Sequence, residues 1–166
     1  MSLQDWGALG ELVGGIAIIV SLFYVGLQIN QSTKATRAAT NQSFGAQYSG
    51  IMLQLARADV SKVFWKGING LENLKGRELP AYMAFMAAIL RTYETFYFEA
   101  IEGRFESKMF DSWLMQLTDL FGNEGVIEYW ELRQHNFSHD FVKFVDQKVS
   151  GTVMQPMYPE QPSKTT

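Results

Sequence analysis

The hydrophobic and polar positions divide the chain into two unlike parts. From Leu12 to Ile29 the sequence reads LVGGIAIIVSLFYVGLQI, which contains no charged residue and one amide side chain. As an α-helix this stretch would extend for about 27 Å, close to the hydrocarbon thickness of a bilayer. The pattern therefore predicts a single transmembrane helix, with an N-terminal flank, over residues 1–33.

Two other structures would also explain an apolar N-terminal stretch. A cleaved signal peptide normally begins with basic residues and has a shorter apolar core, whereas MSLQDWGALGE contains no Lys or Arg. A buried helix of a soluble bundle is the second alternative. The length of the uncharged run favours an uncleaved membrane anchor over both.

The charged residues predict the orientation of the anchor. Lys34 and Arg37 follow the apolar stretch, and no basic residue precedes it. Because cytoplasmic flanks carry the excess of Lys and Arg, we expect the N-terminus outside and the C-terminal domain in the cytoplasm, as in a single-pass protein of a bacterial inner membrane.

The remainder of the chain has helical rather than strand patterning, so an all-α fold is predicted. The membrane helix should continue as one long helix to about Arg57, and shorter helices should follow as a small bundle over residues 34–150. Pro80 suits the first turn of a long helix that Gly103 would stop, and Asp59, Ser107, Asn123 and Ser138 are predicted N-caps. Three of the four prolines lie in residues 151–166, which predicts a loosely ordered tail.

The amino-acid composition excludes several kinds of chemistry but does not identify an activity. The 166 residues include no Cys, which excludes disulfides, thiolate nucleophiles and Cys-ligated metals. A net charge of -3 argues against nucleic acid as a partner, because such proteins present a basic face to phosphates. No cofactor motif and no acid, base and nucleophile constellation is visible, so no catalytic residue, metal ligand or cofactor is predicted.

Three segments resemble a family of uncharacterised bacterial proteins that have one membrane helix and a small helical cytoplasmic domain. The segments are Glu11 to Thr33, Leu90 to Phe105 and Tyr129 to Val149, and the resemblance extends over nearly the whole chain. Its signatures fall on Gln28, Gln31, Arg91, Glu94, Trp130, Arg133, Phe137 and Ser138. The family often has Arg where this chain has Asn30, which weakens the charge signal for orientation. The resemblance implies this fold and topology, and it implies no activity.

One face of the predicted first helix carries residues at a spacing of alternately three and four, and nearly all of them are small or have an amide side chain. Small residues at this spacing let helices approach closely in a membrane, and Gly10 with Gly14 forms a GxxxG pair. The pattern predicts self-association into a homo-oligomer. We call this row the small-residue face; it consists of Gly7, Gly10, Gly14, Ala17, Ser21, Tyr24, Gln28, Gln31, Ala35, Ala38, Gln42, Gly45, Ser49, Met52 and Ala56.

Other candidate groups are better explained by structure than by chemistry. Arg91 and Glu94 are three residues apart and should form a partly buried ion pair. His135 and His139 have the spacing of a zinc-binding pair, but a helix boundary at Ser138 would break that spacing. The 14% of aromatic residues would form the bundle core, or alternatively line an apolar ligand pocket.

The function predicted from these features is that of a membrane-anchored, non-enzymatic scaffold or interaction module that self-associates through its first helix. The alternative is an oligomeric ion channel or pore. In that case the small-residue face would line the axis with neutral dipoles, and Glu11 would form a ring at the outer mouth.

Overall fold

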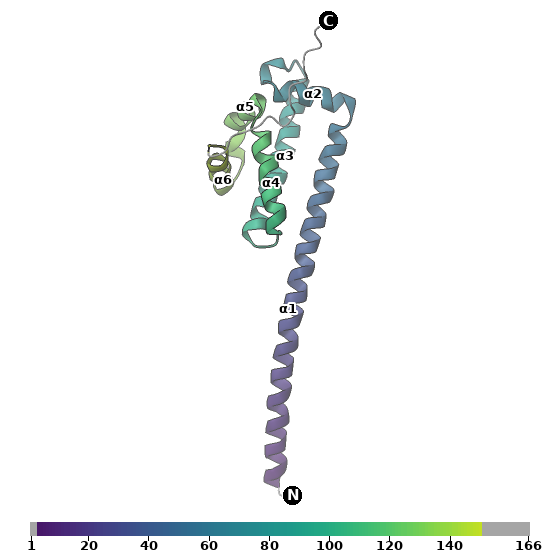
Figure 1. Cartoon of the computed structure of the whole chain (residues 1–166), viewed down its shortest axis with the longest axis vertical. Helices are drawn as coiled ribbons and strands as arrows, with labels where there is room; N and C mark the ends of the chain where they lie inside the picture. The colour runs from purple at the N-terminus through teal and green to yellow at the C-terminus, as the bar shows by residue number, and fades with distance from the viewer. Residues whose placement is uncertain (1–2, 151–166) are drawn as a thin grey trace. The chain divides into compact units, whose positions relative to one another are not determined.

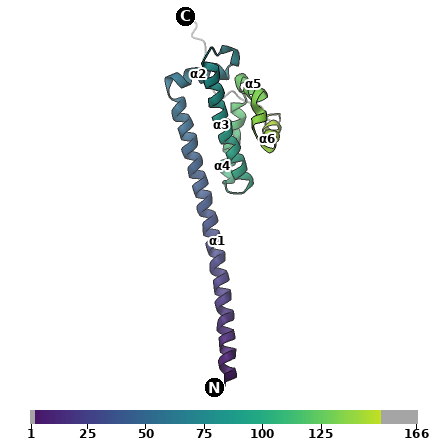
Figure 2. The same ribbon diagram turned by 180° about the vertical axis from the view of Figure 1, so that it is seen from behind.

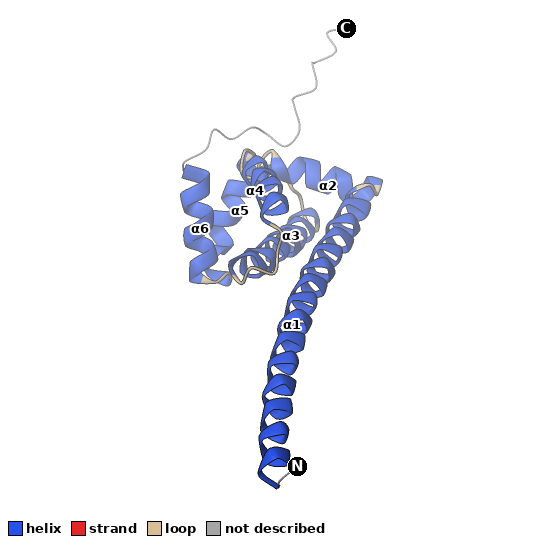
Figure 3. Ribbon diagram, turned by 60° about the horizontal axis from the view of Figure 1, so that its bottom comes forward, coloured by secondary structure: helices blue, strands red, loops and turns tan. Residues whose placement is uncertain are grey.

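The computed structural model describes residues 3–150, so the predicted tail at 151–166 lies outside the described residues. Within residues 3–150 every regular element is a helix, which confirms the predicted all-α fold (Figure 3). Figure 1 shows their order along the chain. The α-helices are α1 (Leu3–Leu55), α2 (Ala58–Ile68), α3 (Glu78–Ile101), α4 (Ser107–Leu120), α5 (Glu124–Arg133) and α6 (His139–Ser150), with 3-10 helices η1 (Leu71–Asn73) and η2 (Gln134–Asn136).

The chain divides into two compact units, Met1–Ala39 and Thr40–Thr166. The sequence placed the boundary six residues earlier, after residue 33. The later boundary has a simple physical reason, because residues 34–39 are exposed and the half-buried positions of α1 begin at Thr40.

Within the first unit, α1 has a segment that is long and apolar enough to cross a membrane. Its most apolar window has a mean hydropathy of 2.2, and none of that window is buried inside the protein. The hydroxyls of Ser21, Thr33 and Thr36 each donate a hydrogen bond to the carbonyl four residues earlier, at 2.8 to 3.0 Å. The helix therefore satisfies these polar side chains internally.

Helix α3 is the central element of the second unit. It lies side by side with α4 in opposite views of the molecule (Figures 1 and 2). Pro80 falls in its first turn, as predicted, and its end is marked by Gly103, whose φ of 68° is the left-handed conformation that glycine adopts at helix C-termini. Tyr82, Met86, Leu90 and Phe96 form a buried stripe along α3, and the remaining helices pack around it.

Helices α2 and α5 approach each other at a pair of glycines. A Cβ atom added to Gly125 would lie 1.6 Å from the carbonyl oxygen of Gly67, and one added to Gly67 would lie 2.2 Å from the ring of Tyr82. Only hydrogen fits at either position. The two glycines thus set the separation of α2 from α5 and seat the Tyr82 ring over α2.

Three predicted N-caps have other roles in the structure. Asp59 lies inside the first turn of α2 and pairs with Arg57, which takes the N-cap position. Helix α4 already includes Ser107, so Glu106 holds that position there. Asn123 precedes α5 as expected, but its amide donates to the carbonyls of Asp119 and Leu120 and so closes the end of α4 instead.

We expect Gly125→Ala to destabilise the bundle by about 3 kcal/mol, because the added methyl group meets backbone that can move only with its helix. The matched control is Gly50→Ala, where an added Cβ atom has no neighbour within 4 Å. That substitution should be neutral or stabilising by up to about 1 kcal/mol, because Ala favours helix. Thermal unfolding measured by circular dichroism compares the two, and equal melting temperatures would contradict the close approach of α2 and α5.

Candidate functional site

The candidate site predicted from the sequence lies on α1, and the structure leaves its side chains uncovered. Apart from the adjoining backbone of the helix itself, no atom lies within 4 Å of a Cβ atom built on Gly7, Gly10 or Gly14. The remaining predicted positions in this part of α1 are also exposed, namely Glu11, Ala17, Ser21, Tyr24, Gln28 and Gln31. Within a single chain, the small-residue face is therefore accessible along the whole apolar segment.

The opposite side of the same segment carries large apolar side chains. Leu12, Ile16, Ile19 and Phe23 lie about 180° around the helix from Gly14 and Ser21, because each residue advances the helix by about 100°. They are exposed as well, with Phe23 at 71% and Ile19 at 67% of full exposure. The segment thus presents two chemically different surfaces, one bulky and one small.

Beyond Thr40, one side of α1 packs against the bundle. We call it the docking face; it consists of Phe44, Tyr48, Ile51 and Leu55, all half-buried. The Phe44 ring meets the ring of Phe96 edge-on at 4.4 Å between centroids, and that of Phe105 at 5.5 Å. Gln42, Gly45 and Ser49, which continue the small-residue face, remain exposed on another side of this segment. Met52 is half-buried instead, so the small-residue face does not stay fully open to its end.

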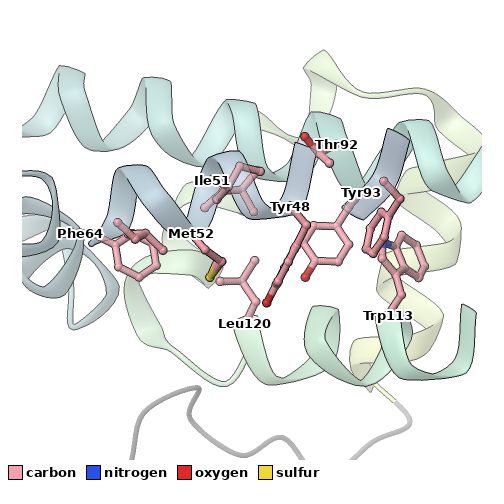
Figure 4. Close-up of a pocket in the computed structure, with 11 residues that line it drawn as sticks. Tyr48, Ile51, Met52, Phe64, Thr92, Tyr93, Trp113 and Leu120 are labelled. Carbon is pink, nitrogen blue, oxygen red and sulfur yellow. The ribbon is translucent and has the colours of Figure 1, made fainter. Parts of the chain in front are cut away.

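A small cavity lies between the docking face and helices α3 and α4. Figure 4 shows the rings of Tyr48, Tyr93 and Trp113 around it, with Leu120 and Met52 on its other side. The volume available to the centre of a water molecule is about 20 Å³, room for about one water. The aromatic residues here therefore form a nearly closed core.

Burial controls the ionisation and hydrogen bonding of the polar groups around this cavity. It raises the pKa of the Tyr93 hydroxyl well above its usual range, and the nearby Tyr48 and Asp119 raise it further. Tyr93 is consequently neutral throughout the physiological range. The indole N–H of Trp113 is buried without a hydrogen-bond partner among the described residues. Neither group is poised to transfer a proton at neutral pH.

Arg91 and Glu94 form a salt bridge on α3, and their contacts reach well beyond that helix. Glu94 is buried, with its side chain 8% exposed, whereas Arg91 is 55% exposed. The second Glu94 oxygen accepts a hydrogen bond from the backbone N–H of Ser138 at 2.7 Å. Arg91 donates to the carbonyl of Asn136 at 3.0 Å and lies 4.8 Å from the centre of the Phe137 ring. The pair therefore fastens α3 to the segment that begins α6.

A second ion pair lies at the C-terminal end of α3, and a hydrogen bond from Thr40 links it to α1. Arg104 donates two hydrogen bonds to Glu99, at 2.7 and 3.0 Å. These bonds lower the pKa of the Glu99 carboxyl below its usual range, and a hydrogen bond from Thr40 lowers it further. Thr40 is the first residue of the second unit, so this contact lies where α1 enters the bundle.

The two histidines do not share a helix. His135 lies in η2 and His139 is the first residue of α6, and Phe141 N–H donates to the Ser138 hydroxyl at the boundary between them. The i, i+4 geometry that a zinc pair needs is therefore broken. No group of three or more His, Cys, Asp or Glu that could hold a metal occurs among the described residues.

Sequence reasoning missed the longer-range parts of these sites. It placed Arg91 beside Glu94 but gave no sign that Glu94 would accept from Ser138, 44 residues away. It also missed the docking face, although Phe44, Tyr48, Ile51 and Leu55 have a helical spacing of four, three and four. Their periodicity was the one available signal, and the small residues between them obscured it.

Removing the arginine of the buried pair tests its structural role. We expect Arg91→Ala to destabilise the bundle by about 2 kcal/mol, because it leaves a buried carboxylate without its counter-charge. The double variant Arg91→Ala with Glu94→Gln should recover part of the loss, since the amide oxygen can still accept from Ser138. Thermal unfolding supplies the measurement.

Arg57→Ala is the control for this test. It removes a salt bridge to Asp59 whose two side chains are 62% and 69% exposed, so the melting temperature should stay unchanged. Equal melting temperatures for Arg91→Ala, Arg57→Ala and the parent protein would show that the Arg91–Glu94 pair has no structural role.

Comparison of the chain with protein-family models, with curated proteins and with solved structures found no match. The likeness of the three segments to a bacterial family accordingly stays a prediction.

Proposed function

We propose that the protein is a membrane-anchored, non-enzymatic scaffold that self-associates through α1 and presents its helical domain to partners in the cytoplasm. The observation that carries the proposal is the apolar window of α1, which has a mean hydropathy of 2.2 and no buried part. A core helix of a soluble protein would be covered by its own chain. Lipid is the surrounding that suits this surface.

The two sides of the apolar segment suit two different environments, lipid on one side and another helix on the other. Lipid tails can cover the bulky side with Leu12, Ile16, Ile19 and Phe23 at no cost, because they are as apolar as these side chains. The small-residue face offers lipid little to pack against, but it lets another helix approach to backbone contact. Copies of the chain are the proposed occupants of that face.

The exposed glutamines at the end of the apolar segment and beyond it fit the same arrangement. Gln28, Gln31 and Gln42 are exposed, and each amide has both a donor and an acceptor to offer a neighbouring copy. The docking face occupies a different side of α1 at residues 44–55, so the bundle leaves Gln42, Gly45 and Ser49 accessible.

The same row of hydroxyl and amide groups supports the alternative function, an ion pathway along the axis of an oligomer. The Ser21 hydroxyl donates to the carbonyl of Ala17, so it would offer passing ions only its oxygen. Current across a planar bilayer separates the two functions, because a scaffold conducts nothing when correctly assembled.

Self-association predicts opposite results for two leucine substitutions. Gly14→Leu should reduce the protein to single copies, because the added side chain separates neighbouring helices along the small-residue face. It meets nothing within its own chain, since no atom lies within 4 Å of the Cβ position. Ile19→Leu, on the bulky side, should keep the parental copy number.

Native mass spectrometry of both variants in one detergent measures the number of chains directly. An unchanged copy number in Gly14→Leu would exclude the proposed interface, and so would a loss of copies in Ile19→Leu alone.

The proposed orientation, with the N-terminus outside a bacterial inner membrane, can be tested with single cysteines because the chain has none of its own. A cysteine at Thr166 should be shielded from a membrane-impermeant maleimide in intact spheroplasts, and one at Ser2 should be labelled. The reverse pattern would show that Lys34 and Arg37 do not set the topology.

A further inference from the structure

An apolar groove on the surface of the second unit is a candidate docking site. It lies where η1, the start of α3 and the end of α5 meet, and it has a volume of about 480 Å³. Leu132 and Leu79 in its wall are 55% and 39% exposed, so the groove presents aliphatic surface to the outside. Its lining residues are Leu71, Leu79, Pro80, Met83, Leu132 and Arg133.

The elements around the groove are held in place by specific contacts. Glu128 on α5 accepts a hydrogen bond from the backbone N–H of Leu71 at 2.7 Å, which fixes η1 against α5. Pro80 lies in the first turn of α3, where the Pro ring restricts the backbone. Among the described residues of the lining, the exposed Arg133 supplies the one charge.

We propose that this groove binds the C-terminal segment of the same chain through Met157 and the residues that follow it, within residues 153–160, whose sequence is VMQPMYPE. The segment is rich in apolar side chains, and methionine fits irregular aliphatic surfaces well because it is unbranched and flexible. Its prolines lower the entropy cost of binding in an extended conformation. Glu160 supplies the negative charge that complements Arg133.

The chain is long enough to make this contact. Trp130 on α5 donates a hydrogen bond to Asp146 on α6 at 3.1 Å, so these two helices are neighbours. Ser150, the last residue of α6, is one helical turn past Asp146, and Leu132 is two residues past Trp130. The end of α6 is therefore within roughly 20 Å of the groove, and the seven residues from position 151 to position 157 span about 23 Å when extended, so Met157 and the residues after it can reach the groove.

A second groove provides an internal comparison. It lies between α2 and α3, has a volume of about 310 Å³, and is lined by Val60, Val63, Phe85 and others. Its charged residue is Asp59, which repels Glu160. Charge thus favours the groove with Arg133 as the binding site of the tail.

Disulfide trapping tests the assignment in the full-length protein in nanodiscs, because the chain contains no cysteine. The test pair is Leu132→Cys with Met157→Cys, and the control pair is Val60→Cys with Met157→Cys. Under mild oxidation we expect the test pair to form a disulfide within one chain at least tenfold faster than the control pair. Equal rates, or a product that joins two chains, would overturn the proposal.

Charge reversal provides a second, independent readout. Arg133→Glu added to the test pair should slow its trapping severalfold, and Glu160→Arg added to that variant should restore the rate. A rate that does not respond to either change would show that Arg133 does not bind the segment, and would overturn the assignment of Glu160 to it.

Discussion

The uncovered apolar surface of α1 is the physical constraint on which the proposed function depends. Side chains such as Ile19 and Phe23 are about two-thirds exposed or more, and each would cost roughly 1.5–3 kcal/mol in water relative to burial. Over the whole segment this sum would exceed the stability of an ordinary small domain. The segment is long and apolar enough to cross a membrane.

The helices of the bundle are short and are held together with few charged residues. Its core is mainly aromatic, and Phe44 brings α1 into that core through edge-on contacts with Phe96 and Phe105. Glu94, the one buried carboxylate among the described residues, is compensated by Arg91 and by the Ser138 N–H. These contacts connect α1, α3 and α6, which are distant in sequence. The Arg91–Glu94 pair thus fixes where α6 begins, whereas apolar burial supplies most of the stability.

The local features of the fold could be predicted from the sequence, and the contacts between helices could not. The uncharged run from Leu12, the Pro80 start and the Gly103 stop are local signals, and each corresponds to the predicted feature of the structure. The approach of Gly125 to Gly67 has no local signal, because a glycine near a helix start is also typical of a turn. Asn123 shows the same limit. Its position before α5 could be predicted from the sequence, but the hydrogen bonds of its amide to the end of α4 could not.

The central claim is that the two sides of the apolar segment have different surroundings, lipid on one and protein on the other. Nitroxide labels at Ile19→Cys and Ser21→Cys, one at a time in lipid vesicles, measure this difference directly through their collision rates with oxygen and with a water-soluble nickel complex. The account predicts high oxygen accessibility at position 19 and low accessibility to both reagents at position 21. Equal oxygen accessibility at the two positions, or strong collision with the nickel complex at position 19, would contradict it.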